Sequence, residues 1–103
     1  MDDARKAVLM AYCRIDELAP GEDVVLEGMY LDALGYLAGA GIPVPESGTA
    51  RAAQFDQRVN ELVLDAWDNR GTQTAGFTLT ENPAFRRKIN QLKMTVPVPV
   101  LEG

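Results

Sequence analysis

The residues best suited to chemistry in this chain are few, and they do not form a catalytic pattern. The chain contains no histidine, so it lacks the commonest general base and the commonest ligand of transition metals. It also lacks a glycine-rich phosphate loop ending in Lys-Ser or Lys-Thr, since the Gly-Ala-Gly at 39–41 follows a predicted helix instead of opening one. The sequence therefore predicts a protein that is not an enzyme and that uses no cofactor and no metal.

Two weaker candidates for chemistry have ordinary alternatives. Asp65 and Asp68 are three residues apart, so both carboxylates could face one cation on a helix, but a magnesium site needs further oxygen ligands and a substrate phosphate. Solvated charges at a helix end are the favoured interpretation. Cys13 lies beside Arg14, whose charge would favour a reactive thiolate, although an ordinary half-buried thiol is expected. As the only cysteine, Cys13 excludes an internal disulfide and a multi-cysteine zinc site, and it indicates a reducing compartment.

The one basic cluster consists of Arg86, Arg87 and Lys88, with Lys93 about a turn further on. Three consecutive helical positions cover most of the outer face of a helix, so a solvated surface is the default interpretation. The sharper alternative is an interface with an acidic neighbouring subunit or with passing DNA.

Length and composition limit the remaining possibilities. The 103 residues suit one domain, and 47% hydrophobic with 24% charged residues is the balance of a globular protein. The net charge of −5 disfavours a general phosphate-binding surface. No apolar run approaches the roughly 20 residues of a membrane-spanning helix, and the start MDDARK does not resemble a secretion signal. We therefore expect synthesis in the cytoplasm and no membrane partner.

Apolar spacing predicts a short first helix and a longer second helix. Asp2 and Asp3 can cap the first, which lasts about three turns and ends where DELAPG begins. Its predicted core face contains Ala4, Val8, Ala11 and Ile15. The second helix is expected to have Pro20 in its first turn and Glu22 and Asp23 near its positive end, and its apolar spacing runs from Val25 to about Ala40. Its predicted core face contains Leu26, Met29 or Tyr30, Ala33, Leu37 and Ala40.

The second helix is more apolar than one buried face requires. Val24, Leu34 and Tyr36 widen its apolar surface, which suggests a contact between subunits. The GIPVPESG segment that follows contains two prolines and must be a connection.

The third predicted helix begins after a cap at Thr49 or Ser47 and runs to Arg70, followed by a stop at Gly71. Its length of about 20 residues spans ~30 Å at 1.5 Å per residue. The predicted core face contains Ala52, Phe55, Val59, Leu62, Val63 and Ala66. Trp67 ends this face, and a core or rim position is favoured over a base-stacking role.

The last third of the chain predicts one more helix and an arm. Residues 72–81 suit a short strand or an extended loop. Asn82 and Pro83 are typical of a helix start, and a fourth helix with Phe85, Ile89 and Leu92 inward should end near Lys93. The final MTVPVPVLEG cannot be helical because of its prolines. It is either a disordered end or an extended strand that adds its alternating valines, Val96, Val98 and Val100, to a partner.

Together these segments predict an all-α fold. Two long antiparallel helices are flanked by shorter N- and C-terminal helices in a domain covering residues 1–94, and residues 95–103 form an extended arm.

The order of the segments resembles the small helical head-tail connector proteins of tailed bacteriophages, also called head-completion, adaptor or DNA-packaging proteins. The resemblance covers about residues 4–92. It is carried by Arg14-Ile15-Asp16, by the alanine and apolar spacing from Leu26 to Gly41, by LVLDAWDNR at 62–70, and by the helix after Asn82. The longer GIPVPESGTA connection and the Val-Pro tail depart from the family's pattern.

The resemblance implies a structural role in the virion, at the head-tail junction. Family members form a ring of about a dozen subunits under the portal after DNA packaging, extend the channel through which the genome passes, and present a platform for the next neck or tail protein. The isolated chain would form rings by itself or only on the portal. Residues expected at subunit or portal contacts are Leu34, Tyr36, Trp67, Arg70, Arg86, Arg87, Lys88, Val96, Val98 and Val100. The alternative is a small helical interaction module or DNA-binding regulator.

Overall fold

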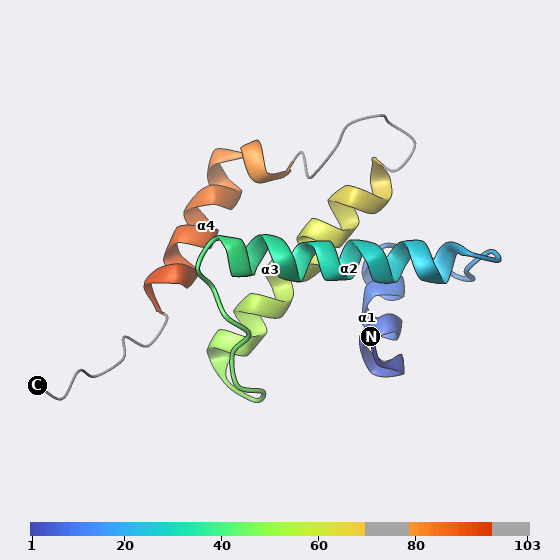
Figure 1. Ribbon diagram of the computed structural model, residues 1–103, viewed down its shortest axis with the longest axis horizontal. Helices are drawn as coiled ribbons and strands as arrows, with labels where there is room; N and C mark the ends of the chain where they lie inside the picture. The colour runs from blue at the N-terminus through green and yellow to red at the C-terminus, as the bar shows by residue number, and fades with distance from the viewer. Residues whose placement is uncertain (70–78, 96–103) are drawn as a thin grey trace, which may run out of the picture.

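The regular structure of the chain is helical wherever the structure describes it. The computed structural model describes residues 1–69 and 79–95 (Figure 1). Four α-helices and one short 3-10 turn account for the regular structure of these residues, which confirms the predicted all-α fold of four helices. The elements in chain order are α1 (Asp3–Tyr12), α2 (Glu22–Gly39), α3 (Ala50–Asp68), the 3-10 turn η1 (Leu79–Glu81) and α4 (Pro83–Met94).

Three of the four α-helices begin with a side-chain cap that the sequence predicted. The Asp2 carboxylate accepts a hydrogen bond from the Arg5 amide at 2.7 Å, and the Thr49 hydroxyl accepts one from the Ala52 amide at 3.0 Å. The Asn82 side chain accepts from two amides of α4, with Pro83 in the first helical position. Each cap satisfies amides that have no partner within the helix. Helix α2 starts differently, after left-handed Gly21 with no side-chain cap, so that Pro20 precedes the helix instead of lying in its first turn, while Glu22 and Asp23 occupy the first turn.

Helices α1 and α2 end with the same backbone arrangement. At the end of α2 the Ile42 amide donates to the Leu37 carbonyl at 2.9 Å, and at the end of α1 the Ile15 amide donates to the Met10 carbonyl at 2.8 Å. Each arrangement needs one residue with positive φ, which is Gly41 (86°) after α2 but Arg14 (59°) after α1. A glycine adopts this conformation without strain, whereas an arginine does not.

Helix α3 is the centre of the fold, because it packs against α1, α2, η1 and α4. Figure 1 shows α2 crossing α3 obliquely, with the two helices running in broadly opposite directions and α1 and α4 toward opposite ends of the pair. Four of the six predicted core positions of α3 are buried, the other two, Ala52 and Ala66, are half-buried, and Trp67 is also buried. The buried side chains of α3 are Phe55, Val59, Asn60, Leu62, Val63 and Trp67.

The predicted core face of α1 is wrong. Ala4, Val8 and Ala11 are exposed, whereas Leu9 and Cys13 are buried in the core. Apolar residues occur on every side of this ten-residue helix, so spacing alone does not select one face. The structure turns the larger Leu9 toward α3, which buries more apolar area than an alanine would.

Two boundaries also differ from the prediction in the second half of the chain. Leu79–Glu81 form a 3-10 turn instead of a strand or extended loop, and the Leu79 amide donates to the Asp65 carboxylate at 3.1 Å. That hydrogen bond attaches η1 to α3. Helix α4 continues through Met94, which the prediction assigned to the non-helical tail. The predicted stop at Gly71 and the extended arm lie outside the described residues.

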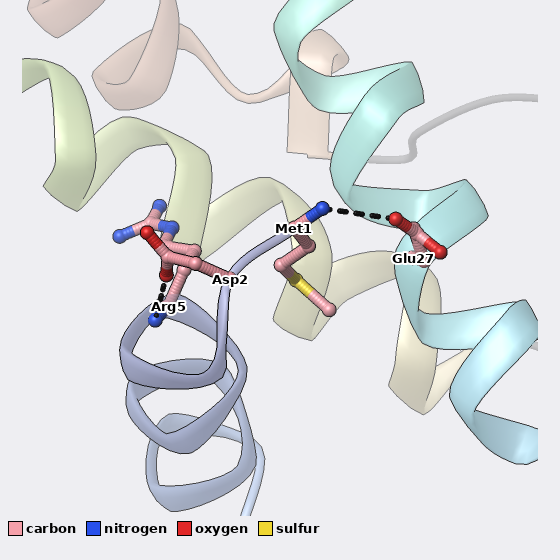
Figure 2. Close-up of polar contacts among 4 residues, drawn as sticks. All are labelled: Met1, Asp2, Arg5 and Glu27. Carbon is pink, nitrogen blue, oxygen red and sulfur yellow. Dashed lines mark hydrogen bonds and ion pairs between the residues drawn. The ribbon is translucent and has the colours of Figure 1, made fainter.

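Polar contacts connect the first residues of the chain to α2 (Figure 2). The amino group of Met1 donates to the Glu27 carboxylate at 2.9 Å, while the Asp2 carboxylate caps α1 through the Arg5 amide. The Arg5 guanidinium also lies over the ring of Tyr30, 5.4 Å from its centre. These contacts join two helices whose backbones do not pack closely.

Candidate interaction surface

The basic residues of α4 are held outward by the apolar side of the same helix. Phe85, Ile89 and Leu92 are buried in the core, so the positions between them face away from it. Arg86, Arg87 and Lys88 are exposed, and they form no ion pair with any described residue. The predicted surface cluster is therefore present in the structure as a set of available cations.

A cleft of about 570 Å³ separates α4 from the last turns of α2. Its lining is mixed: Tyr36, Ala40 and Ile89 give it an apolar floor, and cationic side chains form its rim. The full lining is Tyr36, Ala40, Pro83, Arg86, Arg87, Ile89, Asn90 and Lys93. Lys88 is not part of it. Three positive charges around an apolar floor suit an anionic partner that also presents an apolar side chain.

Gly41 helps to shape this cleft, which the sequence did not indicate. A Cβ atom at Gly41 would lie 3.3 Å from Cε of Lys93, so the bare backbone of the α2 end lets the lysine side chain pass closely. The same glycine provides the positive φ that ends α2. One residue therefore both terminates the helix and leaves room for a rim cation.

The predicted apolar excess of α2 is real, but its members divide between two places. Leu34 and Tyr36 are half-buried and pack against the core, with Tyr36 also lining the cleft. Val24, by contrast, is 70% exposed. Sequence reasoning missed Leu31, which is 56% exposed.

One row of exposed and half-exposed residues on α2 contains no charged side chain. Positions four and three residues apart lie in a row on a helix, and this row consists of Val24, Gly28, Leu31, Gly35 and Ala38. No heavy atom lies within 4 Å of a Cβ built at Gly28 or Gly35. We call this row the outer face of α2. Its signal in the sequence was the seven-residue spacing of Val24, Leu31 and Ala38.

Trp67 is a core residue, with only 6% of its surface exposed. This confirms the core or rim interpretation and leaves little of the ring for a subunit contact. The other predicted contact residues, Arg70, Val96, Val98 and Val100, lie outside the described residues.

Asp65, near the end of α3, has a structural role, whereas Asp68 is exposed. Asp65 accepts from the Leu79 amide at 3.1 Å and from the Asn69 side chain at 3.2 Å. Asn69 also donates to the Asp65 carbonyl at 2.7 Å and so helps to end α3. Within residues 1–69 and 79–95, no group of three or more histidine, cysteine or acidic residues could hold a metal ion.

One tyrosine near these acids has a shifted pKa. Burial raises the pKa of Tyr12 above its ordinary value of 10.0, and the neighbouring negative charge of Glu61 raises it further. Glu61 in turn pairs with Arg58 one turn earlier on α3, and both side chains are largely buried. A neutral tyrosine hydroxyl beside an ion pair is not a pattern for acid-base catalysis at neutral pH.

Comparison with known proteins gives no match to any family model, curated protein or solved structure. Among the described helices, none is long and apolar enough to cross a membrane. The chain's own surfaces must therefore carry any proposal about its function.

Proposed function

We propose that this chain is a structural subunit of the head-tail connector of a tailed bacteriophage or prophage. It forms a ring under the portal protein, completes the head after DNA packaging, and provides the platform for the next neck or tail protein. It is not an enzyme. The proposal combines the family resemblance of the segment order with one observation, the outer face of α2.

The outer face of α2 supports a subunit contact because it is apolar, exposed and free of charge. Val24 and Leu31 present large apolar side chains to solvent, which is costly over a contiguous area unless a partner covers it. Gly28 and Gly35 leave open space between them, so the backbone of another helix can approach closely. Leu26, Ala33 and Leu37 on the opposite side of α2 are buried in the core, so this face remains for a neighbour.

The net charge of −5 is compatible with a channel protein. DNA that must pass through a ring without stopping is better surrounded by repulsive than by attractive charge. Any cations would then be expected at contacts between proteins, and the exposed α4 cluster fits that role.

The test is binding to a portal protein from the same genome. We expect the purified chain to form rings by itself or on portal assemblies, as seen by electron microscopy and analytical ultracentrifugation. Leu31→Asp should abolish ring formation while leaving the far-UV circular dichroism spectrum and stability nearly unchanged, because Leu31 is more than half exposed. Gln54→Asp, at an exposed position of α3, is the matched control and should assemble normally. A chain that stays monomeric and fails to bind the portal at high concentration contradicts the proposal.

A DNA-binding regulatory module is the second candidate, because Arg86, Arg87 and Lys88 lack ion-pair partners among the described residues. It requires duplex binding that weakens steeply with salt and disappears when all three are replaced by alanine. Fluorescence anisotropy with a random duplex at physiological ionic strength distinguishes the two candidates.

A further inference from the structure

Charge is strongly segregated along this chain. Residues 15–50 contain seven acidic residues and no lysine or arginine; the acids are Asp16, Glu17, Glu22, Asp23, Glu27, Asp32 and Glu46. Residues 79–95 contain four basic residues, Arg86, Arg87, Lys88 and Lys93, against the single acid Glu81. The net charge of −5 therefore conceals one strongly negative and one positive region.

The fold places the acids near the start of α2, Asp16, Glu17 and Asp23, far from the basic residues of α4. Figure 1 shows α4 at one end of the molecule and the start of α2, with the connection from α1, at the other. The molecule is elongated, 55 × 29 × 19 Å along its principal axes, whereas charges are screened over about 8 Å at physiological salt. The two ends of one chain therefore cannot neutralise each other.

The end of the molecule at the start of α2, which we call the acidic end, is complementary in charge and polarity to the cleft beside α4. Asp16, Glu17 and Asp23 are exposed there, and Val24 beside them is 70% exposed. The cleft offers Arg86, Arg87 and Lys93 around an apolar floor, as described above. An apolar side chain with flanking carboxylates matches an apolar floor with flanking cations in both charge and polarity.

We infer that the acidic end of one copy, at the start of α2, docks into the α2-α4 cleft of a second copy of this chain. The contact is head-to-tail, so each copy keeps one free acidic end and one free cleft. Repetition of such a contact gives a ring if the rotation closes and a filament if it does not. The inference rests on the proposed function, because it assigns a second contact between neighbouring subunits of the ring, in addition to the outer face of α2.

The first experiment measures self-association of the full chain by sedimentation velocity across a range of salt. We expect the wild type to associate at low salt and to dissociate as salt rises. Arg86→Glu and Asp23→Lys should each weaken association at least about tenfold, since each places like charges together. The matched controls are Lys88→Glu, on α4 but outside the cleft, and Asp56→Lys, exposed on α3; both should remain near the wild type.

The decisive experiment mixes two charge-reversed proteins. Arg86→Glu/Arg87→Glu carries negative charge at both ends, and Glu17→Lys/Asp23→Lys carries positive charge at its docking end as well as in its cleft. Neither should associate alone. An equimolar mixture should regain association to within about threefold of the wild type, because every contact again joins opposite charges. This recovery also shows that both variants are folded.

Three outcomes would overturn the inference. One is a wild type that stays monomeric up to about 1 mM at low salt, which corresponds to less than about 4 kcal/mol of association free energy. Another is a mixture that remains monomeric although each variant shows native circular dichroism. The third is a cleft that binds duplex DNA in a salt-dependent manner without any self-association.

Failure of this inference and failure of the proposed function give different results. Portal binding that survives both charge reversals, without recovery in the mixture, overturns only the docking contact. Recovery in the mixture without any portal binding establishes the docking contact and contradicts the connector role.

Discussion

Trp67 is the largest side chain in the core of this small protein, and it lies one residue before the end of α3. Replacing it with alanine should destabilise the protein by about 3–5 kcal/mol, because the lost apolar contacts leave a cavity in a close-packed core. Urea unfolding followed by far-UV circular dichroism measures the loss, since the only tryptophan is removed.

Leu31→Ala is the comparison for Trp67→Ala, because Leu31 is 56% exposed and should cost less than about 0.5 kcal/mol. A Trp67→Ala protein as stable as the wild type but unable to assemble would instead place this ring in a subunit contact.

Tyr12 gives the protein a pH dependence that can be measured directly. Its pKa is raised in the folded state, mainly by burial and then by Glu61, so folding favours the neutral hydroxyl. This contribution to stability is fully present below the unfolded pKa of 10.0 and is lost as the pH rises through the higher folded value. As the pH rises above 10.0 the wild type should therefore lose more stability than Tyr12→Phe. Urea unfolding at a series of pH values measures this, and an equal dependence of the unfolding free energy on pH in the two proteins would contradict it.

At the residue scale, sequence patterns identified the buried positions of three helices and failed for α1. The inward positions of α3 and α4 alternate with charged residues, so helical spacing distinguishes their two sides. In α1 the candidates Val8 and Leu9 are adjacent, and only the approach of α3 decides between them. Burial that depends on a distant element has no local signal.

Among the elements, α1 and α2 end alike but with different strain. Arg14 holds φ at 59°, a conformation that costs a residue with a Cβ about 1–2 kcal/mol relative to right-handed backbone. Arg14→Gly should therefore stabilise the protein by about 0.5–1 kcal/mol after the greater flexibility of the unfolded chain is counted. Thermal unfolding measures the gain.

Arg14→Ala separates backbone strain from loss of the arginine side chain, because alanine keeps the strain. It should give no gain. Equal stabilisation by both substitutions would show that the charge, not the left-handed backbone, is responsible.

The glycines of the outer face of α2 are expected to lower the stability of the helix and to leave space for the backbone of a neighbouring subunit. Gly35 is in a helix interior with no atom within 4 Å of a Cβ built on it. Gly35→Ala should therefore stabilise the monomer by about 0.5–1 kcal/mol. The same methyl group would obstruct a neighbouring backbone, so ring formation on portal assemblies should weaken. Ala38→Gly is the reverse control: it should lower monomer stability without filling the face. Stabilisation with unchanged assembly would exclude close approach at Gly35.

The boundaries of the elements were predictable where a side chain or a proline sets them. Asp2, Thr49 and Asn82 cap their helices as expected. The start of α2 was predicted slightly early, with Pro20 in the first turn, because Gly21 is the cap residue and offers no side-chain signal. The 3-10 turn before α4 was missed because its attachment is a hydrogen bond from Leu79 to Asp65, fourteen residues earlier.

For the molecule as a whole, stability should be unevenly distributed around α3. It is the one described helix that packs against all the other helices, whereas α1 and α4 each lie on one flank. Amide hydrogen exchange should therefore be slowest around Val59 and Val63, at the rate of global unfolding, and faster in α1 and α4. Mass spectrometry of exchange time courses measures this. Equal protection in all four helices would indicate a single cooperative unit.

The cleft shows what sequence reasoning could and could not supply at this scale. The basic cluster of α4 and the apolar excess of α2 were each visible in the sequence. Their meeting was not, because about fifty residues separate Tyr36 from Arg86, and only the packing of both helices on α3 brings them to one cleft. Which residues of the two helices lie together in the cleft therefore depends on the tertiary structure alone.

The absence of basic residues from α2 also determines how this protein will behave toward trypsin, which cuts only after lysine and arginine. Between Arg14 and Arg51 there is no such residue, so the whole of α2 travels in one fragment, residues 15–51. The two cutting points lie in the left-handed turn after α1 and in the first turn of α3. The peptide that contains α2 is therefore released only after both of these turns have opened and been cut, so its appearance in limited digestion reports their combined opening.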